Sequence, residues 1–195
     1  ATYLTQHFIF MFLQFTSAAT GMAAAVAVFK AFRDKTTTDM GNFWDFFVKS
    51  ITRVLLPISV VIALILTFNG TPSSYAAKDK FISLQGDTVT LSRGPAAQMI
   101  AIKHLGTNGG GYFGANSAHP FENPNYLTNM TEITSQFIIP VGMIIALGFF
   151  IRRRKLSWII FGVMLVGTLM LMIPSIVSEV GGNPEIAKMG ITQAT

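Results

Sequence analysis

Residues 106–125 read GTNGGGYFGANSAHPFENPN, and this stretch decides how the rest of the chain is interpreted. Three consecutive glycines stand among Asn, Thr, Ser and His residues, whereas the surrounding sequence is largely apolar. Glycine adopts positive backbone dihedral angles at little steric cost, so Gly109, Gly110 and Gly111 allow consecutive carbonyls to turn toward one axis. A row of such carbonyls can replace the hydration shell of a cation, and Thr107 can add its hydroxyl or carbonyl at the inner end of the row.

The composition of the chain is that of a membrane protein. Of its 195 residues, 51% are hydrophobic and only 12% are charged, with a mean hydropathy of +0.51. These values are too apolar for an ordinary soluble domain. The sequence contains no cysteine, which excludes disulfides, thiolate metal sites and a cysteine nucleophile.

Four uncharged runs are long enough to cross a bilayer as helices, which takes about 20 residues. We predict the first membrane helix within residues 1–33 and the second over 48–69, with Pro57 inside it. The third is predicted over 130–151 and the fourth over 156–178. Between the first two, residues 34–47 combine Asp39, a candidate N-cap, with several aromatic side chains. That pattern is typical of a cytoplasmic segment lying at the membrane interface.

The basic residues predict the orientation of these helices. If the connections between the first and second helices and between the third and fourth face the cytoplasm, that side carries nine cations and three carboxylates. The opposite side is left with five cations and six carboxylates. Cytoplasmic loops are enriched in Lys and Arg, so the net charge of +5 is a signal of topology. It therefore gives no support to nucleic-acid binding.

The connection between the second and third helices has two parts. Residues 70–92 are predicted to form an external loop with one hairpin turning at Gly86-Asp87. Residues 95–105 are predicted to form a short helix with Pro95 in its first turn and Gly106 at its C-terminal cap. About 11 residues rise only ~16 Å, so this helix can enter a membrane but cannot cross it.

An irregular return after such a helix is tolerated at membrane depth only when it is buried in protein or lines a wet cavity. The partially negative C-terminal end of the short helix points at the glycines, which favours a cation. The sequence thus predicts an all-α membrane protein. Residues 48–151 are predicted to form a unit of helix, pore helix, filter over 106–112 and helix, as in potassium channels.

Four segments resemble the potassium-binding A subunit of the Kdp potassium-importing P-type ATPase, the family KdpA. They are FTSAATGMAAAVAVFKAFR (15–33), GNFWDFFVKSITRVLLPISVVIALIL (41–66), HLGTNGGGYFGANSAHPFENPN (104–125) and EVGGNP (179–184). In that family, four channel-like repeats surround one pore and each contributes a filter strand. The resemblance implies that the filter positions of the second repeat are Thr107, Asn108, Gly109, Gly110 and Gly111.

The resemblance also implies the setting in which the chain works. Potassium is the transported ion, without an organic cofactor, and ATP is hydrolysed by a partner, the P-type ATPase catalytic subunit, accompanied by small accessory subunits. The expected location is the plasma membrane, or inner membrane, of a bacterium or archaeon, in contact with membrane lipid. The chain itself is expected to be a non-catalytic subunit.

The chain departs from the family pattern in two respects. Tyr112 stands where a Phe is usual, and the chain has about a third of the expected family length. Helix 1–33 is expected to close the first repeat, helix 156–178 to open the third, and residues 179–195 to form an external segment. One filter strand of four cannot encircle an ion, so this chain alone is not expected to form the pore.

Other functions fit parts of the sequence less well. A passive Trk-like or Ktr-like potassium channel subunit would share the pore loop but not the longer resemblance. A secondary transporter would aim a helix N-terminus at an anionic substrate, whereas here a C-terminus is expected to face the site. Gly109, Gly111 and Gly114 also fit the dinucleotide pattern G-x-G-x-x-G, with Glu132 near the spacing of a ribose-binding acid. The segment that follows opens no helix, as such a site requires.

Four polar residues admit more than one role. Lys103 can reach outward, pair with Glu122, or pair with an acid of another repeat. His119 and Glu122 can line the outer mouth, where a carboxylate concentrates cations, or can hold the loop by hydrogen bonds and a salt bridge. The second role is the simpler one for loop residues. His7 stands alone on the first helix, which favours a packed histidine over a proton relay.

Overall fold

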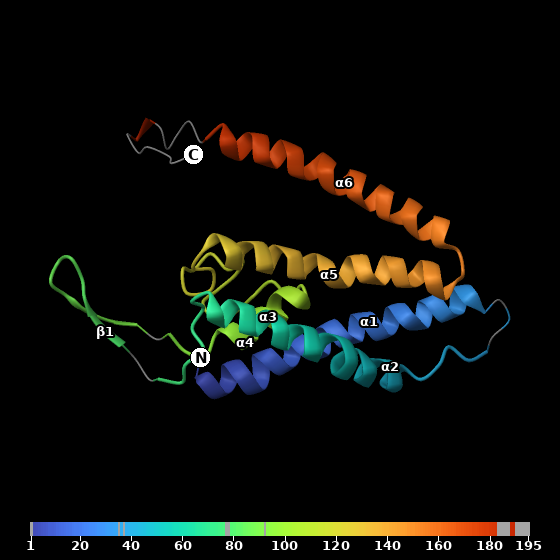
Figure 1. The fold of residues 1–195 in the computed structure, drawn as a ribbon, viewed down its shortest axis with the longest axis horizontal. Helices are drawn as coiled ribbons and strands as arrows, with labels where there is room; N and C mark the ends of the chain where they lie inside the picture. The colour runs from blue at the N-terminus through green and yellow to red at the C-terminus, as the bar shows by residue number, and fades with distance from the viewer. Residues whose placement is uncertain are drawn as a thin grey trace. The chain divides into compact units, whose positions relative to one another are not determined.

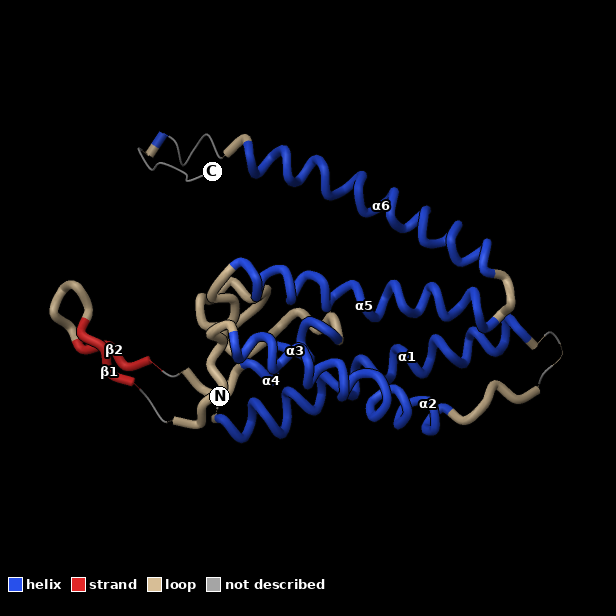
Figure 2. Tube along the Cα trace, viewed as in Figure 1, coloured by secondary structure: helices blue, strands red, loops and turns tan. Residues whose placement is uncertain are grey.

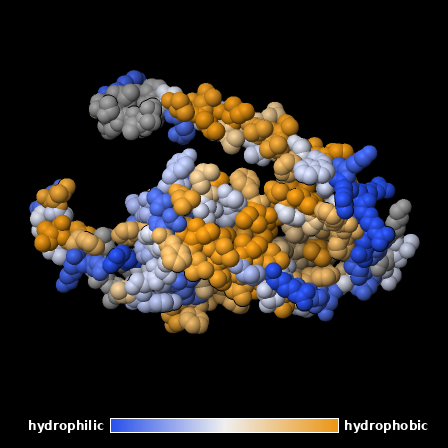
Figure 3. Space-filling view, viewed as in Figure 1, coloured by the Kyte–Doolittle hydropathy of each residue, from blue (hydrophilic) through white to orange (hydrophobic). Residues whose placement is uncertain are grey.

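The computed structural model describes residues 2–34, 36, 38–76, 79–91, 93–182 and 188–189, and it is largely helical (Figures 1 and 2). Four of the described helices are long and apolar enough to cross a membrane, which confirms the prediction of an all-α membrane protein. They run over Thr5–Arg33, Phe43–Phe68, Tyr126–Phe150 and Arg154–Val180. Apolar side chains cover much of the helical surface, and the most hydrophilic ones gather over connecting segments (Figure 3).

The first spanning helix begins as a π-helical stretch, Thr5–Met11 (η1), and continues as α1, Phe12–Arg33. Ala19 and Ala23 on α1 are completely buried. Small side chains of this kind let membrane helices approach closely, and α1 packs against both α2 and α4. The helix therefore presents its alanine face to the rest of the fold.

The second spanning helix is built from α2 (Phe43–Ser50), the π-helical stretch η2 (Ile51–Leu55) and α3 (Leu56–Phe68). It begins five residues before the predicted start at 48, because Asn42 caps it by accepting hydrogen bonds from the backbone N–H groups of Trp44 and Asp45. Asp39 is not the cap; its carboxylate accepts from the Gly41 N–H at 2.7 Å. The π-helical turns lie directly before Pro57, which cannot donate to the helical ladder.

The connection between the second spanning helix and α4 contains the predicted hairpin. Strands β1 (Asp79–Ile82) and β2 (Thr88–Leu91) pair in antiparallel fashion, with Asp79 opposite Leu91 and Ile82 opposite Thr88. The Ser83 N–H donates to the Asp87 carbonyl at 2.8 Å, and Gly86 takes a positive φ of 88°. The turn at Gly86-Asp87 is confirmed.

The short helix α4, Ala97–Leu105, lies at the centre of the hydrophobic core (Figure 1). Its first N–H groups, from Ala96 and Ala97, both donate to the Pro72 carbonyl at 2.9 and 3.0 Å. Its apolar side chains pack against buried residues of the second spanning helix, namely Leu55, Ile62 and Leu66. A helix this short, enclosed on all sides, is held in place by tertiary contacts rather than by its own propensity.

The chain divides into two compact units, residues 1–143 and 144–195, each considered by itself. Helix α5, Tyr126–Phe150, begins in the first unit, where the Asn125 side chain accepts from the Thr128 N–H at 3.0 Å. The second unit contains the end of α5 and helix α6, Arg154–Val180. Of the predicted external segment 179–195, residues 183–187 and 190–195 lie outside the described part.

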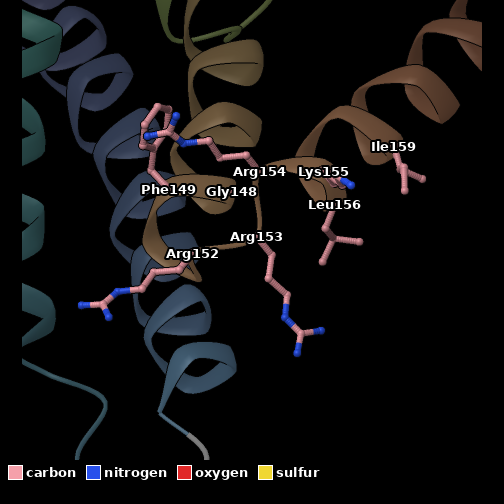
Figure 4. Close-up of a pocket in the computed structure, with 8 residues that line it drawn as sticks. All are labelled: Gly148, Phe149, Arg152, Arg153, Arg154, Lys155, Leu156 and Ile159. Atoms are coloured by element: carbon pink, nitrogen blue, oxygen red, sulfur yellow. The ribbon is translucent and has the colours of Figure 1, made fainter.

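A basic turn joins α5 to α6 within the second unit. It borders a cavity of about 690 Å³ lined by Gly148, Phe149, Arg152, Arg153, Arg154, Lys155, Leu156 and Ile159 (Figure 4). The Arg154 guanidinium lies over the Phe149 ring, 4.4 Å from its centroid, while the Arg152 and Arg153 side chains extend away from the turn. The four consecutive cations Arg152, Arg153, Arg154 and Lys155 thus lie at the short connection between two spanning helices, and its cytoplasmic location stays a prediction.

Candidate functional site

The glycine-rich stretch follows α4 without a break. Gly106 N–H donates to the Ile102 carbonyl at 2.8 Å, Thr107 N–H to His104 at 3.1 Å, and Asn108 N–H to Lys103 at 2.9 Å. These bonds satisfy the last carbonyls of the helix and reverse the chain. The partially negative end of α4 therefore lies at the start of the predicted filter, as expected from the sequence.

Thr107 has the most unusual backbone of the predicted filter residues. Its φ is 53°, in the left-handed region that β-branched side chains rarely occupy. Backbone strain of this kind persists only where the surrounding structure holds it, and it clusters at functional sites. Sequence reasoning placed the conformational freedom at the glycines and did not identify Thr107 as the strained position.

The three glycines have different roles in the turn. Only Gly109 among them has a positive φ, of 83°. The loop then doubles back: Gly111 N–H donates to the Gly114 carbonyl at 2.8 Å, and Asn116 N–H donates to the Gly109 carbonyl at 3.2 Å. A Cβ atom at Gly111 would lie 2.5 Å from Cδ and 2.8 Å from Nζ of Lys103, so a side chain there would force Lys103 to shift.

Several carbonyls of the predicted filter accept hydrogen bonds within the chain. The Asn108 carbonyl accepts from Gly110 N–H at 3.1 Å, and the Gly110 carbonyl accepts from the side-chain amide of Gln14 at 2.9 Å. A carbonyl oxygen has two lone pairs, so each of these groups keeps a second acceptor site that a cation can use. The five residues Thr107 to Gly111 thus form one short, carbonyl-bearing loop.

Two glutamines of the first spanning helix hold this loop from the side. Besides the Gln14 bond to Gly110, the Gln6 amide donates to the Tyr112 carbonyl at 3.4 Å. Both glutamines are buried. Sequence reasoning missed them, although a polar side chain inside an otherwise uncharged membrane helix is itself a signal of function.

A buried ion pair lies behind the loop. Lys103 Nζ is 2.5 Å from a carboxylate oxygen of Glu122 and donates to the Ser117 hydroxyl at 2.8 Å. Glu122 also accepts from the Phe113 N–H at 2.7 Å. The Lys103 and Glu122 side chains are each only 1% exposed. Pairing between Lys103 and Glu122 is therefore confirmed, and the role of Glu122 as a cation-attracting carboxylate at an open mouth is wrong.

His104 extends this buried network to α5. Its Nε2 lies 2.7 Å from the Ser117 hydroxyl and 3.1 Å from a carboxylate oxygen of Glu132, and its Nδ1 lies 2.7 Å from the Gln136 amide. His104 was not identified from the sequence. The signal available was a histidine beside Lys103 on a short helix expected at membrane depth.

The other two histidines have packing roles. His119 stacks on Phe113, with ring centroids 4.5 Å apart, and its Nδ1 accepts from the Phe121 N–H at 3.1 Å. It holds the loop, as the simpler interpretation predicted. The His7 ring lies 5.7 Å from Tyr75, and within the described residues neither of its buried nitrogens has a hydrogen-bond partner. This environment agrees with a packed histidine.

Tyr112, the departure from the usual Phe, directly follows the three glycines of the loop. Burial raises the pKa of its phenol to about 12, with smaller contributions from Tyr3 and Tyr75. The hydroxyl therefore stays protonated at physiological pH. It also lies against Gly94, whose φ is 55° and where a Cβ atom would collide with the phenol oxygen.

Two cavities border the loop, and both are lined in part by Ser17 and Asn108. A cavity of about 420 Å³ adjoins Thr107 and Asn108 and is walled by α1 and α5. A second, also of about 420 Å³, adjoins Gly110 and Gly111 beside Gln14. The dinucleotide interpretation fails, because in the described chain no helix begins between Gly114 and the start of α5 at Tyr126.

These features define a multi-pass membrane protein in which a short buried helix and a glycine-rich loop are held among spanning helices. Residues 1–195 match the model of the family KdpA, described as potassium-transporting ATPase A subunit, and the chain belongs to this family.

The chain is similar to proteins named potassium-transporting ATPase potassium-binding subunit. It is 61% identical to the one from Flavobacterium psychrophilum over 194 residues, which are 100% of this chain and 34% of that protein. Identity to the Bacteroides thetaiotaomicron protein is 52% over 192 residues, 98% of this chain and 34% of the relative. For Geobacillus kaustophilus it is 42% over 187 residues, 96% of this chain and 33% of the relative. The chain thus spans about a third of the length of these relatives.

Proposed function

We propose that this chain is the section of a potassium-binding subunit that contributes one of four selectivity-filter strands to an ATP-driven potassium import complex. Thr107, Asn108, Gly109, Gly110 and Gly111 form the strand. Potassium ions lose water there and are selected before transfer, while a partner chain, a P-type ATPase, hydrolyses ATP. The complex, with its small accessory subunits, lies in the plasma membrane of a bacterium or archaeon.

One observation carries this proposal. A strained, carbonyl-bearing loop begins at the C-terminal end of a buried helix, within a chain that is 61% identical to a relative named as a potassium-binding subunit. Carbonyl oxygens and the negative end of a helix favour a cation. The loop is a single strand, which is why the proposal places three further strands in the rest of the complex. Residues 48–151 then correspond to one channel-like repeat.

The test uses the full-length parent subunit co-purified with its ATPase partner. Potassium-stimulated ATP hydrolysis is measured against potassium concentration for the wild type and for Gly109→Ser, which forces a side chain onto a backbone with φ of 83°. We expect the half-maximal potassium concentration to rise at least about tenfold, equivalent to roughly 1.4 kcal/mol of lost binding.

The matched control is Gly142→Ser, on α5, where a Cβ atom meets nothing within 4 Å. It should leave the potassium dependence unchanged. If the potassium dependence of ATP hydrolysis were unchanged for Gly109→Ser in an assembled complex, this loop would have no role in ion selection. Potassium flux that is indifferent to ATP would replace the pump with a passive Trk-like or Ktr-like channel.

A further inference from the structure

Lys103 is connected to both ends of the loop. Its backbone carbonyl accepts from Asn108 N–H at 2.9 Å, which anchors the start. Its ammonium group pairs with Glu122 at 2.5 Å, and Glu122 accepts from Phe113 N–H at 2.7 Å, which anchors the end. The stretch 108–113 is therefore suspended between two attachments that both lead back to one residue of α4.

The loop also lies directly against the lysine side chain. A Cβ atom at Gly111 would lie 2.5 Å from Lys103 Cδ and 3.1 Å from a carboxylate oxygen of Glu122, so it could be added only if the ion pair shifted. The ion pair thus supports the middle of the stretch as well as its end at Phe113, whereas the start is held by the Lys103 backbone carbonyl. A displacement of the ammonium group would be transmitted to the Gly111 backbone.

Stability alone does not explain a charged pair in this place. Both side chains are 1% exposed, and a buried ion pair is often no more stabilising than apolar side chains of similar volume. An apolar pair would, however, leave the Phe113 N–H without its acceptor. The ion pair instead fixes the positions of the groups that it joins, because charge-assisted hydrogen bonds are short and have a defined geometry.

We propose that Lys103 is a positioning residue that sets the length and alignment of the stretch 108–113, and through it the discrimination between potassium and other monovalent cations. The inference rests on the proposed function, that this stretch is a filter strand. Selection by carbonyl oxygens depends on their number and placement around the ion. A change in the distance between the two attachments therefore alters which ion fits best.

The experiment compares Lys103→Met, Glu122→Gln and Glu132→Gln in the full-length subunit within the purified complex. Glu122→Gln keeps an acceptor for Phe113 but removes the charge. Glu132→Gln removes a carboxylate of equal charge and 2% exposure that makes no described hydrogen bond with the loop, Lys103 or Glu122 and reaches the ion pair only through His104 and Ser117, so it is the matched control for a lost buried charge. The readout is the half-maximal concentration of potassium and of rubidium for stimulated ATP hydrolysis.

For Lys103→Met we expect the half-maximal potassium concentration to rise about tenfold, as for one lost charge-assisted hydrogen bond, and the preference for potassium over rubidium to shrink. Glu122→Gln should change the preference in the same direction by less. Glu132→Gln should keep the wild-type ratio. If Lys103→Met does not assemble, Glu122→Gln, which is isosteric with glutamate, supplies the decisive ratio.

Two results would overturn the proposal. Assembled complexes with wild-type ion ratios would show that the pair only stabilises the fold. An equal loss of preference in Glu132→Gln would show that any lost buried charge has this effect.

A second measurement separates this inference from the proposed function. Amide hydrogen exchange in the same purified complexes should be faster in Lys103→Met over residues 106–116, with little change over residues 160–175 of α6, which belong to the other compact unit. If the wild type shows no potassium-stimulated hydrolysis, the proposed function fails. The exchange result then decides the positioning role by itself, and unchanged protection over 106–116 would contradict it.

Discussion

Helices α3 and α4 pack against each other, yet they differ in which side chains they bury. Helix α3 is apolar almost throughout, and it buries only the stripe formed by Ser59, Ile62 and Leu66. Helix α4 buries eight of its nine residues, including Lys103 and His104. In a soluble protein, most of the exposed apolar side chains of α3 would be buried, and Lys103 and His104 of α4 would be exposed.

This difference between α3 and α4 is the one expected when the exterior of a protein faces an apolar environment. Exposed side chains of α3 include Val60, Val61, Leu64 and Phe68, which suits contact with lipid or with another apolar chain. The charges of α4 are enclosed with their partners, because ionisable groups at membrane depth are costly unless they are paired. The buried polar side chains therefore lie beside the candidate site, and the exposed apolar side chains form the surface suited to lipid or to another apolar chain.

The largest loss of stability is expected when one partner of the buried Lys103–Glu122 ion pair is removed. Glu122→Leu leaves the Lys103 ammonium buried without its counter-charge, which should lower the free energy of unfolding by about 3–5 kcal/mol. The measurement is the unfolding of the full-length subunit in detergent. The double variant Lys103→Met with Glu122→Leu should recover much of the loss, since an apolar pair can replace a buried ion pair. Equal instability of the single and double variants would contradict this account.

The two faces of α3 provide the next comparison. Leu66 is completely buried against α4, whereas Leu64 is 52% exposed. Leu66→Ala should cost about 2–5 kcal/mol, because it removes core contacts and leaves a cavity. Leu64→Ala should change the free energy of unfolding by no more than about 0.5 kcal/mol. The same unfolding measurement applies to both, and similar losses would mean that α3 has no distinct buried stripe.

The smallest effect concerns two glycines. Gly111→Ala forces a methyl group onto the Lys103 side chain and should cost about 1–3 kcal/mol by overpacking. Gly142→Ala, on α5 with nothing within 4 Å of the new atom, should be neutral or stabilise the helix by up to about 1 kcal/mol. Thermal unfolding of the two variants checks the difference. An unchanged melting temperature for Gly111→Ala would contradict the close contact between Gly111 and the Lys103 side chain.

The sequence alone predicted the parts of the fold that depend on local composition. The four spanning helices follow from the length of uncharged runs, and the hairpin turn follows from Gly86-Asp87. The short helix expected over 95–105 runs over Ala97–Leu105, because Pro95 and Gly106 bound it locally. Each of these features is encoded within a few neighbouring residues, so it can be read without knowing what lies across the fold.

The partners within the candidate site were decided only by the tertiary structure. Lys103 had three possible roles in the sequence, two of them ion pairs, and packing of α4 against the returning loop selected the pair with Glu122. The bond from Gln14 to Gly110 joins residues 96 positions apart, and the bond from His104 to Gln136 joins residues 32 apart. Hydrophobic periodicity predicts which face of a helix or strand is buried, but it does not predict which side chains of other elements contact that face. The sequence therefore determined the membrane class and the position of the loop, while long-range packing determined what holds that loop in place.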